Sequence, residues 1–309
     1  MRNTFYIFWS IIFTLLLISC ESQSKRKFDK NSNSIPKTHI SNKSKLFSVE
    51  SKNKTGNLKI LSWNIQDLGK SKNTQEIYQI AQIIKDFDIV AIQEVVAIDP
   101  KGVQALAKIS DELNILGNKW DYSISDPTKS PTNNMSERYA FIWKTSKLNL
   151  LQKPFLDKEL ESQCVREPYI GKFKLKKGNN PFYLINVHAR VHSKNPENEI
   201  IFFKEYSNRL QTENIVILGD FNLNEKHSVW NNLYQIGFKS SIQNAPTTLK
   251  RKCKKGKYLN YSIDNIYYNT SNIELINSGR IDFVNDCENL KSARFLSDHL
   301  PVFLECKIN

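Results

Sequence analysis

Short apolar runs that end in polar side chains recur along most of the chain, and their spacing predicts alternating strands and helices. Residues 58–63 and 89–92 have the length and apolar content of buried strands. Residues 73–87 lie between them and carry apolar side chains at helical intervals. Asn73 and Glu76 stand three residues apart, which is the spacing of a capping box at a helix N-terminus. We therefore expect a strand, a helix and a second strand in this order.

The same alternation continues to the end of the chain. The pattern predicts helices at 103–113 and 200–210, and strands at 139–143, 182–187, 215–218, 265–268 and 302–304. Strands interleaved with helices indicate an α/β fold. Several neighbouring strands lack a helix long enough for a parallel crossover, so we expect mixed sheets. The simplest organisation is one domain over residues 57–309.

The first twenty residues have the pattern of an export signal. Arg2 supplies a positive start, and residues 5–18 form an apolar run interrupted only by Ser10 and Thr14. This run is shorter than the roughly 20 residues that span a membrane. It ends in Leu17-Ile18-Ser19-Cys20, which resembles the lipobox of bacterial lipoproteins and implies lipidation of Cys20. The alternatives are an ordinary cleaved signal or an uncleaved anchor. We expect an extracytoplasmic, membrane-anchored lipoprotein, in the periplasm or on the cell surface.

The segment 21–56 is rich in Ser, Asn and Lys and has almost no aliphatic periodicity. It cannot bury enough apolar surface to offset the entropy of ordering it, so we expect a flexible tether. The formal net charge is +13, of which +6 lies in this tether and +1 at Arg2, leaving +6 for the predicted domain. A basic domain permits acidic partners such as nucleic acid or anionic lipid headgroups without requiring one.

Polar side chains capable of catalysis lie at the ends of the predicted strands repeatedly, most of them after a strand and some of them before one. They are Asn64, Gln93, Glu94, His188, Asp220, Asn222, Asp264, Asp298 and His299. Strand ends meet at one edge of a sheet, so residues distant in sequence can share a cleft. Asn, Glu and Asp offer hard oxygen ligands that suit Mg²⁺, Mn²⁺ or Ca²⁺. Two histidines near them would serve as proton shuttles, a combination that fits metal-assisted hydrolysis of a phosphate ester.

Taken singly, each of these residues has an ordinary structural explanation, but the ordered set resembles a known family. The set consists of Ser62-Trp63-Asn64-Ile65-Gln66, Ile92-Gln93-Glu94-Val95, Asn186-Val187-His188-Ala189, Gly219-Asp220-Phe221-Asn222 and Ser297-Asp298-His299-Leu300-Pro301-Val302. It resembles the five motifs of the endonuclease/exonuclease/phosphatase superfamily over residues 58–303. Three further segments resemble the deoxyribonuclease I-like branch: Glu137-Arg138-Tyr139-Ala140-Phe141, Arg166-Glu167-Pro168, and the stretch from Ala245-Pro246-Thr247-Thr248 to Asp264-Asn265-Ile266. The resemblance implies a four-layer sandwich of two mixed β-sheets with helices on both outer faces.

The resemblance also implies a role for each matching residue. Glu94 is the principal metal ligand, with Asn64 and Asp298 beside it. The implied catalytic residues are His188 with its partner Glu137, His299 with its partner Asp264, and Asp220 and Asn222, which position water or bind phosphate. One histidine acts as base and the other as acid, and the sequence does not say which. The implied metal is Mg²⁺ or Mn²⁺, with Ca²⁺ as a supporting ion.

Three residues are implied as phosphate contacts, each with an ordinary alternative. Arg138 and Arg166 would bind substrate phosphates, or else form structural ion pairs. Thr247 would line the phosphate site, or else occupy a simple turn. The sequence departs from the branch at Met135, where relatives carry an aromatic that stacks in the DNA minor groove.

The cysteines also depart from the branch, because residues 223–229, which follow the Gly-Asp-Phe-Asn motif, contain no Cys to complete the usual disulfide. If Cys20 is lipidated, four cysteines remain, and they allow three full pairings. They are Cys164, Cys253, Cys287 and Cys306. The sequence does not choose among the pairings, and a buried free thiol at Cys306 is a further alternative.

We expect a monomeric, metal-dependent phosphodiesterase, and an endonuclease on DNA by preference. The alternatives are a phosphoesterase of the same fold, acting on a lipid headgroup as a sphingomyelinase does or on an inositol phosphate, and a non-catalytic binding protein. The lipid tether suits the first alternative. The apparently intact set of acid, base and metal positions argues against the second.

Overall fold

The computed structural model describes residues 56–70, 72–97, 100–132 and 135–309. The predicted signal at 1–20, its Cys20, and the predicted tether at 21–56, apart from Gly56, lie outside the described residues. No helix within the described ranges is long and apolar enough to cross a membrane.

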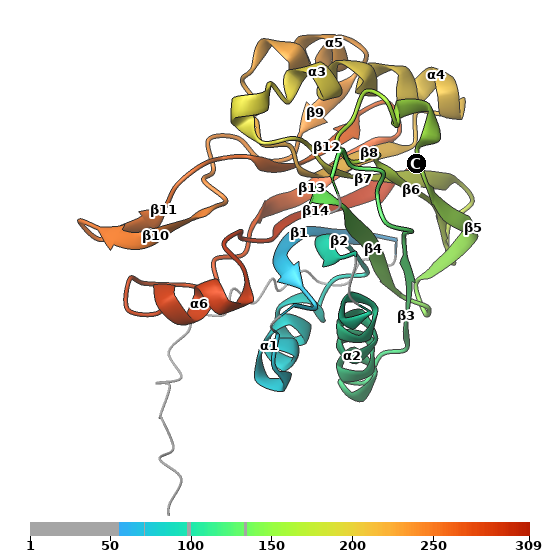
Figure 1. Cartoon of the computed structure of the whole chain (residues 1–309). Helices are drawn as coiled ribbons and strands as arrows, with labels where there is room; N and C mark the ends of the chain where they lie inside the picture. The colour runs from blue at the N-terminus through green and yellow to red at the C-terminus, as the bar shows by residue number, and fades with distance from the viewer. Residues whose placement is uncertain (1–55, 71, 98–99, 133–134) are drawn as a thin grey trace, which may run out of the picture. The chain divides into compact units, whose positions relative to one another are not determined.

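One six-stranded sheet is built around the first two predicted strands (Figure 1). Its strand order is β13-β14-β1-β2-β4-β3. β1 and β2 are parallel, and the other neighbours in this sheet are antiparallel. The strands are β1 (Leu58–Leu68), β2 (Ile89–Val96), β3 (Trp120–Ile124), β4 (Glu137–Lys144), β13 (Ile273–Arg280) and β14 (Val302–Ile308).

A second six-stranded sheet has the order β5-β6-β7-β8-β12-β9. Here β7 and β8 form the parallel pair, and the remaining pairs are antiparallel. The strands are β5 (Leu148–Leu156), β6 (Tyr169–Leu175), β7 (Pro181–His188), β8 (Ile215–Asp220), β9 (Phe238–Ser240) and β12 (Asp264–Asn269). A separate antiparallel hairpin joins β10 (Leu249–Lys254) to β11 (Lys257–Leu259).

The helices cover the outer faces of the two sheets, as Figure 1 shows with α1 and α2 on one side and α3, α4 and α5 on the other. They are α1 (Thr74–Ile84), α2 (Lys101–Ile115), α3 (Glu197–Ile200), α4 (Tyr206–Leu210) and α5 (Asn231–Gln235), whereas α6 (Leu290–Leu296) packs against the β10–β11 hairpin. The predicted capping box is present, because the Asn73 side chain accepts from the Glu76 amide and Glu76 accepts from the Asn73 amide. Short 3₁₀ helices occur at Lys158–Leu160, His192–Lys194, Ile201–Glu205 and Ser228–Trp230.

Three apolar clusters hold these layers together. The aromatic rings of Phe141 and Phe173, 5.6 Å apart, meet between the two sheets. Ile80 and Ile84 of α1 pack on the outer face of the first sheet, and a third cluster lies under the α3–α5 segment. The predicted four-layer sandwich of two mixed sheets is therefore confirmed.

The predicted helix at 200–210 is confirmed, although it is not one continuous α-helix. The chain instead passes from α3 through a 3₁₀ segment at Ile201–Glu205 into α4. Ile200, Phe203 and Tyr206 are all buried at intervals of three residues. A 3₁₀ helix has three residues per turn, so the tighter winding keeps all three on the face that packs on the sheet.

Candidate active site

The carboxyl ends of the two parallel strand pairs bring the predicted site residues together from both sheets. Asn64 and Glu94 come from β1 and β2, and His188 and Asp220 face one another in register at the ends of β7 and β8. Asp264 begins β12 directly opposite Asp220, because these strands are antiparallel. Residues separated by up to 200 positions in the chain thus share one edge of the sandwich.

Each histidine is held on its Nδ1 side by a carboxylate. His188 Nδ1 lies 2.9 Å and 3.0 Å from the two oxygens of Glu137. His299 Nδ1 lies 3.0 Å and 2.9 Å from those of Asp264. This arrangement fixes the orientation of each ring and directs the opposite ring nitrogen into the site. The partners implied by the family resemblance are therefore the ones that the structure places in contact.

Asp220 lies between the two free ring nitrogens. Its Oδ2 is 3.5 Å from His188 Nε2 and 3.8 Å from His299 Nε2. Asn64 also donates to this oxygen from its amide nitrogen, at 3.3 Å. The two histidines therefore face a common point around a single buried carboxylate.

Burial and charge act in opposite directions on these groups. Burial alone lowers the pKa of His299, but the carboxylates of Asp264 and Asp220 outweigh it and raise the pKa to about 10. Burial likewise lowers the pKa of His188, and the Glu137 carboxylate reverses the effect, so the net shift is upward. For Asp220, burial raises the pKa. Both imidazoles therefore hold a proton more tightly than a free imidazole.

The turn that presents Asp220 depends on a glycine. Gly219 has φ +143°, and a Cβ at this position would lie 1.9 Å from the carbonyl oxygen of Val187. The close approach of β7 and β8 thus requires Gly at this position. Two residues on, Asn222 adopts φ +51°, a left-handed conformation that Asn tolerates. Its backbone amide donates to Asp220 Oδ1 at 2.9 Å, and its side chain donates to the carbonyl of Ala189 at 3.1 Å.

The predicted metal ligands Asn64 and Glu94 are in contact. The fully buried Asn64 donates from Nδ2 to Glu94 Oε1 at 3.0 Å, while its own Oδ1 has no hydrogen-bond partner among the described residues. An unpaired buried carbonyl oxygen is costly, and a bound cation would satisfy it. Glu94 is held in a left-handed conformation with φ +60°, and its Oε2 accepts from the Asp67 amide at 3.2 Å. This oxygen-donor pair fits a divalent cation such as Mg²⁺.

The third predicted ligand, Asp298, lies in the loop that reaches back to the same strand end. The hydroxyl of its neighbour Ser297 donates to the carbonyl of Asn64 at 2.7 Å. The Asp298 carboxylate itself pairs with Arg294 of α6 at 3.5 Å. The structure thus ties the Asp298 loop to Asn64, while the role of Asp298 as a ligand stays a prediction.

A second set of possible ligand atoms lies beside the first. Asp220, Asp264 and His299 each offer one ligand atom within 4.8 Å of the others. However, His299 Nδ1 is occupied by its contacts with Asp264. His299 Nε2 is still available as a ligand atom, so the structure offers two sets of ligand atoms, and the metal role of the Asn64–Glu94 pair stays a prediction.

The three predicted phosphate contacts have protein partners in this structure. Arg166 Nε pairs with Glu137 Oε2 at 3.0 Å, so this largely buried arginine holds the partner of His188. Arg138 donates to the carbonyl of Ser125 at 2.8 Å. The hydroxyl of the fully buried Thr247 donates to Asp264 Oδ2 at 2.6 Å. Phosphate binding by these residues stays a prediction, and the contacts show that Arg166 and Thr247 position the carboxylates behind the histidines.

Several supporting contacts carried no signal in the sequence. The backbone amide of His188 donates to the hydroxyl of Tyr139 at 3.0 Å, and Trp63 Nε1 donates to the carbonyl of His299 at 2.9 Å. Gln93 donates to Asn186 at 2.6 Å, which joins β2 of one sheet to β7 of the other inside the sandwich. Gln93 and Asn186 belong to the recognised motifs, but spacing alone does not show that they bond to each other.

The four cysteines of the described residues form one disulfide and leave two free thiols. Cys253 and Cys287 are bonded, and Cys164 and Cys306 are buried and free. None of the three full pairings forms, and Cys306 is the buried thiol that the sequence left open. Burial raises the pKa of the Cys306 thiol to about 12, which keeps it protonated.

Two histidines, each held by a carboxylate, face the buried carboxylate of Asp220. An oxygen-donor pair suited to a cation lies beside them. This combination is that of a hydrolase site for phosphoesters. The model of the endonuclease/exonuclease/phosphatase family matches residues 61–299. The chain belongs to this family and is a hydrolase that acts on phosphoester bonds.

Sequence relatives place the chain near the deoxyribonuclease I-like branch. A deoxyribonuclease-1-like 1 of Sus scrofa is 26% identical over 261 residues, covering 80% of each chain. A deoxyribonuclease of Thioalkalivibrio sp. is 26% identical over 187 residues, covering 56% of this chain and 48% of its own length. The deoxyribonuclease-1 of Gallus gallus is 28% identical, and the match spans 60% of its length.

Solved structures share the fold at lower identity. An endonuclease/exonuclease/phosphatase from Bacteroides vulgatus has 16% identity and a TM-score of 0.59, covering 82% of this chain and 99% of that one. A mannosyl-6-phosphatase of Bacteroides thetaiotaomicron has 18% identity and a TM-score of 0.55, covering 81% and 99%. These structures show that the fold is shared, and they do not identify the substrate of this chain.

Proposed function

We propose that the protein is a divalent-metal-dependent endonuclease that hydrolyses phosphodiester bonds of DNA and acts as a monomer. The observation that carries this proposal is the convergence of His188 Nε2 and His299 Nε2 on Oδ2 of Asp220, next to the unpaired oxygen of Asn64. The relatives named as deoxyribonucleases favour DNA among the phosphodiesters.

The side chains of this site would carry out the proton transfers of hydrolysis. Asp220, with a histidine on each side, would orient the attacking water. As the water oxygen bonds to phosphorus, one histidine takes its proton, and the other gives a proton to the leaving oxygen as the phosphorus–oxygen bond breaks. Glu137 and Asp264 would hold the two imidazoles in place throughout.

Mg²⁺ or Mn²⁺, with Ca²⁺ as a supporting ion, would be held by Asn64 and Glu94 with Asp298 beside them, and would neutralise charge on the phosphate. The chain's own contribution is to hold these oxygens in place. Glu94 is fixed by its strained backbone and by the Asp67 amide, and Asn64 by its burial at the strand end.

A substrate panel tests the proposal. The full-length protein is assayed on supercoiled plasmid, single-stranded DNA, RNA, sphingomyelin, an inositol phosphate and a small phosphodiester. We expect nicking of plasmid with modest sequence preference. Lipid hydrolysis without nicking at any salt concentration would move the protein to the lipid phosphoesterase alternative, and inactivity on every substrate would favour a binding protein.

The cellular location is a second part of the proposal. We propose an extracytoplasmic enzyme held on a membrane by lipid at Cys20, because the apolar run at 5–18 ends at this residue. The Cys253–Cys287 disulfide supports an oxidising compartment. Intact-mass measurement of the native protein, compared with a Cys20→Ser variant, should show the added lipid mass only in the wild type. An unmodified, soluble wild-type protein would contradict the anchor.

A further inference from the structure

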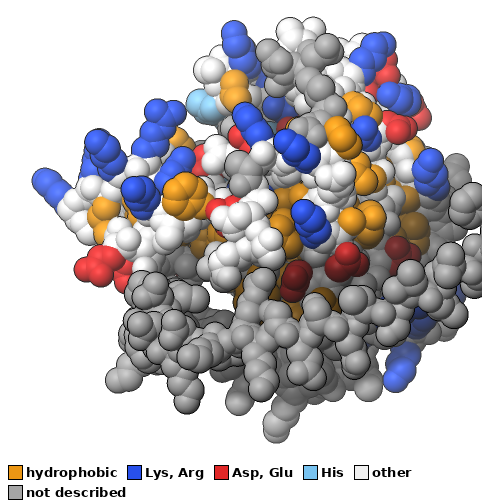
Figure 2. Space-filling view, turned by 60° about the horizontal axis from the view of Figure 1, so that its bottom comes forward, with side chains coloured by type: hydrophobic (Ala, Val, Ile, Leu, Met, Phe, Trp, Pro, Cys, Tyr) orange, Lys and Arg blue, Asp and Glu red, His pale blue; other side chains and the backbone are white. Residues whose placement is uncertain are grey.

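The β10–β11 hairpin carries a dense and unbalanced positive charge. Its basic residues are Lys250, Arg251, Lys252, Lys254, Lys255 and Lys257, and all but Lys250 are exposed. No Asp or Glu occurs between residues 249 and 263. Figure 1 shows the hairpin projecting from the sheets at one edge of the fold, and Figure 2 shows Lys and Arg side chains gathered at that edge.

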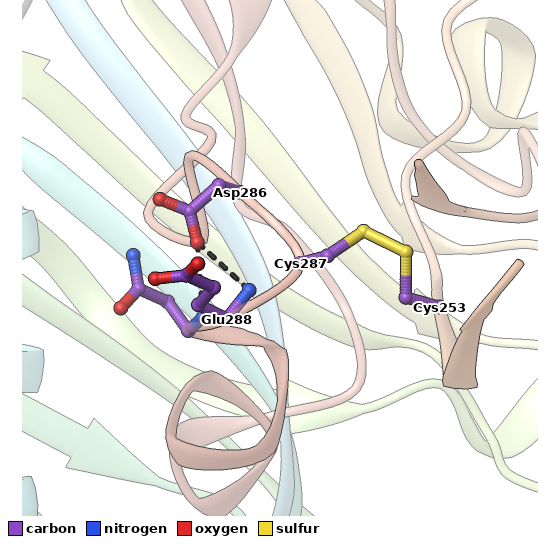
Figure 3. The surroundings of a disulfide bond; sticks show 5 residues. Cys253, Asp286, Cys287 and Glu288 are labelled. Atoms are coloured by element: carbon purple, nitrogen blue, oxygen red, sulfur yellow. Dashed lines mark hydrogen bonds between the residues drawn. A yellow bond between two sulfur atoms is a disulfide. The ribbon is translucent and has the colours of Figure 1, made fainter. Parts of the chain in front are cut away.

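These basic side chains are not neutralised by neighbouring acids. None of the six takes part in an ion pair within the described part of the chain. Asp286 and Glu288 lie across the disulfide, but Figure 3 shows them turned away from Cys253. Asp286 instead accepts from the Glu288 amide at 2.9 Å. Clustered like charges repel one another and do not stabilise the fold, so this surface indicates an anionic partner.

The hairpin is anchored to the active-site loop at its base. The backbone amide of Leu249 donates to the carbonyl of Asp298 at 2.7 Å. Arg294 of α6 bonds both elements, because it donates to the Leu249 carbonyl at 2.9 Å and pairs with the Asp298 carboxylate at 3.5 Å. The Cys253–Cys287 disulfide then ties β10 to the loop before α6, where Leu249 packs on Val284 in an apolar cluster. The charges are therefore held in a fixed place relative to Asp298.

An open groove runs between the hairpin and the predicted metal ligand Asp298. It has a volume of about 590 Å³, and its lining includes Lys250, Arg251, Lys252, Lys254, Arg294 and Asp298. The predicted metal ligand Asp298 thus lies in the same groove as four basic residues of the hairpin. A chain of phosphates that enters the active site past Asp298 would continue along these side chains.

We propose that the β10–β11 hairpin binds the phosphate backbone of a polynucleotide substrate on one side of the bond that is cut. This inference rests on the proposed nuclease function. The six residues of β10 span roughly 20 Å at about 3.3 Å per residue, a length over which a DNA duplex rises by about six base pairs. The contacts are to phosphates, so they add affinity and a minimum substrate length without sequence preference.

Charge removal at the hairpin tests the proposal in the full-length protein. The variant Lys252→Gln/Lys254→Gln/Lys255→Gln removes three charges from exposed positions. The matched control Lys108→Gln/Lys119→Gln/Lys153→Gln removes three charges from exposed positions on α2, the α2–β3 loop and β5. For each protein, kcat/KM on duplex DNA is divided by kcat/KM on a small phosphodiester. We expect this ratio to fall on the order of tenfold in the hairpin variant and to stay unchanged in the control.

Salt and substrate length provide further readouts. The log–log dependence of DNA binding on salt should become shallower by about 2 to 3 units, at about 0.9 per lost phosphate contact. Wild type should cut oligonucleotides of about twelve base pairs better than very short ones, and the hairpin variant should lose most of this preference. Thermal unfolding of all three proteins checks that the substitutions leave the fold intact.

The outcomes separate this inference from the proposed function. If wild type nicks DNA and the hairpin variant nicks it equally well across the salt series, the inference is wrong and the nuclease proposal stands. If wild type cleaves the small phosphodiester but no nucleic acid, the nuclease proposal itself fails. A hairpin variant that keeps full DNA activity but loses salt-dependent binding to anionic phosphatidylglycerol vesicles would assign this surface to a membrane and overturn the proposal.

Discussion

At the residue scale, the site is built so that each histidine has one nitrogen fixed and one nitrogen free. Glu137 and Asp264 hold the Nδ1 side, and both Nε2 atoms face Asp220. The carboxylates are themselves held, Glu137 by Arg166 and Asp264 by Thr247. Each histidine is thus held by a carboxylate, and each carboxylate is held in turn by a further side chain.

The histidines should be interdependent in catalysis. His188→Ala and His299→Ala should each lower kcat by about 10²–10⁴-fold, because each removes one proton transfer. The double variant should lose much less than the product of the two effects, since both groups serve one step. Steady-state kinetics on the true substrate measures this, with His227→Ala as a control outside the site. Near-wild-type kcat in either single variant would show that the assigned role is wrong.

Thr247 should act through Asp264. Thr247→Val keeps the shape of the side chain but removes the hydroxyl that donates to Asp264 Oδ2, and kcat should fall by roughly ten- to a hundredfold. Thr247→Ser restores the donor and should recover most of the activity while KM changes little. A valine variant as active as the serine variant would show that the hydroxyl has no part in positioning Asp264.

The sequence predicted which residues meet at the site better than it predicted the contacts that support them. Residue type and order were enough to select His188, His299, Glu94 and Asp220, because strand ends of a known family carry them. The contacts of Arg166 and Thr247 depend on how two loops fold over the strand ends, and local patterns do not encode that. Sequence spacing therefore does not indicate that Arg166 and Thr247 contact the carboxylates that hold the histidines.

At the element scale, the β7–β8 pair determines how closely His188 and Asp220 approach. The pair is parallel and in register from Tyr183–Ile215 to His188–Asp220. Gly219 lets the two backbones meet at its end, since a side chain there would overlap the Val187 carbonyl. The glycine of the Gly-Asp-Phe-Asn motif is thus a packing requirement that positions Asp220, whose catalytic role is a prediction.

Gly219→Ala should therefore destabilise the fold more than its conformation alone explains. Gly117 also has a positive φ, +102°, but a Cβ there would meet nothing within 4 Å. Gly117→Ala should cost about 1–2 kcal/mol of unfolding free energy, and Gly219→Ala about 3–5 kcal/mol because a steric clash is added to the strain. Denaturant unfolding measures both variants. Equal losses of unfolding free energy in the two variants would show that the clash at Gly219 does not contribute.

In the two six-stranded sheets, the strands that sequence patterns missed all lie at an edge, except β6. The predicted strands correspond to β1, β2, β4, β7, β8, β12 and β14, all of which have neighbours on both sides. The four edge strands β3, β5, β9 and β13 gave no signal. An edge strand such as β13 buries few of its side chains, so it lacks the apolar run by which a strand is recognised. β6 was missed because Lys172 and Lys174 interrupt its apolar positions.

At the scale of the whole molecule, the two sheets supply different parts of one site. The first sheet brings Asn64 and Glu94, the second brings His188, Asp220 and Asp264, and the buried Gln93–Asn186 bond joins the two. The family resemblance predicted the two mixed sheets, but it did not predict which of these residues each sheet supplies. The site therefore depends on the sandwich as a whole.

The most direct test of this account is metal dependence of plasmid nicking by the full-length protein. The protein is assayed with Mg²⁺, again after exhaustive chelation, and again after Mg²⁺ or Mn²⁺ is restored, beside a Glu94→Gln variant. The Asn64–Glu94 pair predicts that nicking disappears on chelation, returns with the metal, and is lost by about 10²-fold or more in the variant. Undiminished nicking after chelation, or a fully active Glu94→Gln variant, would contradict it.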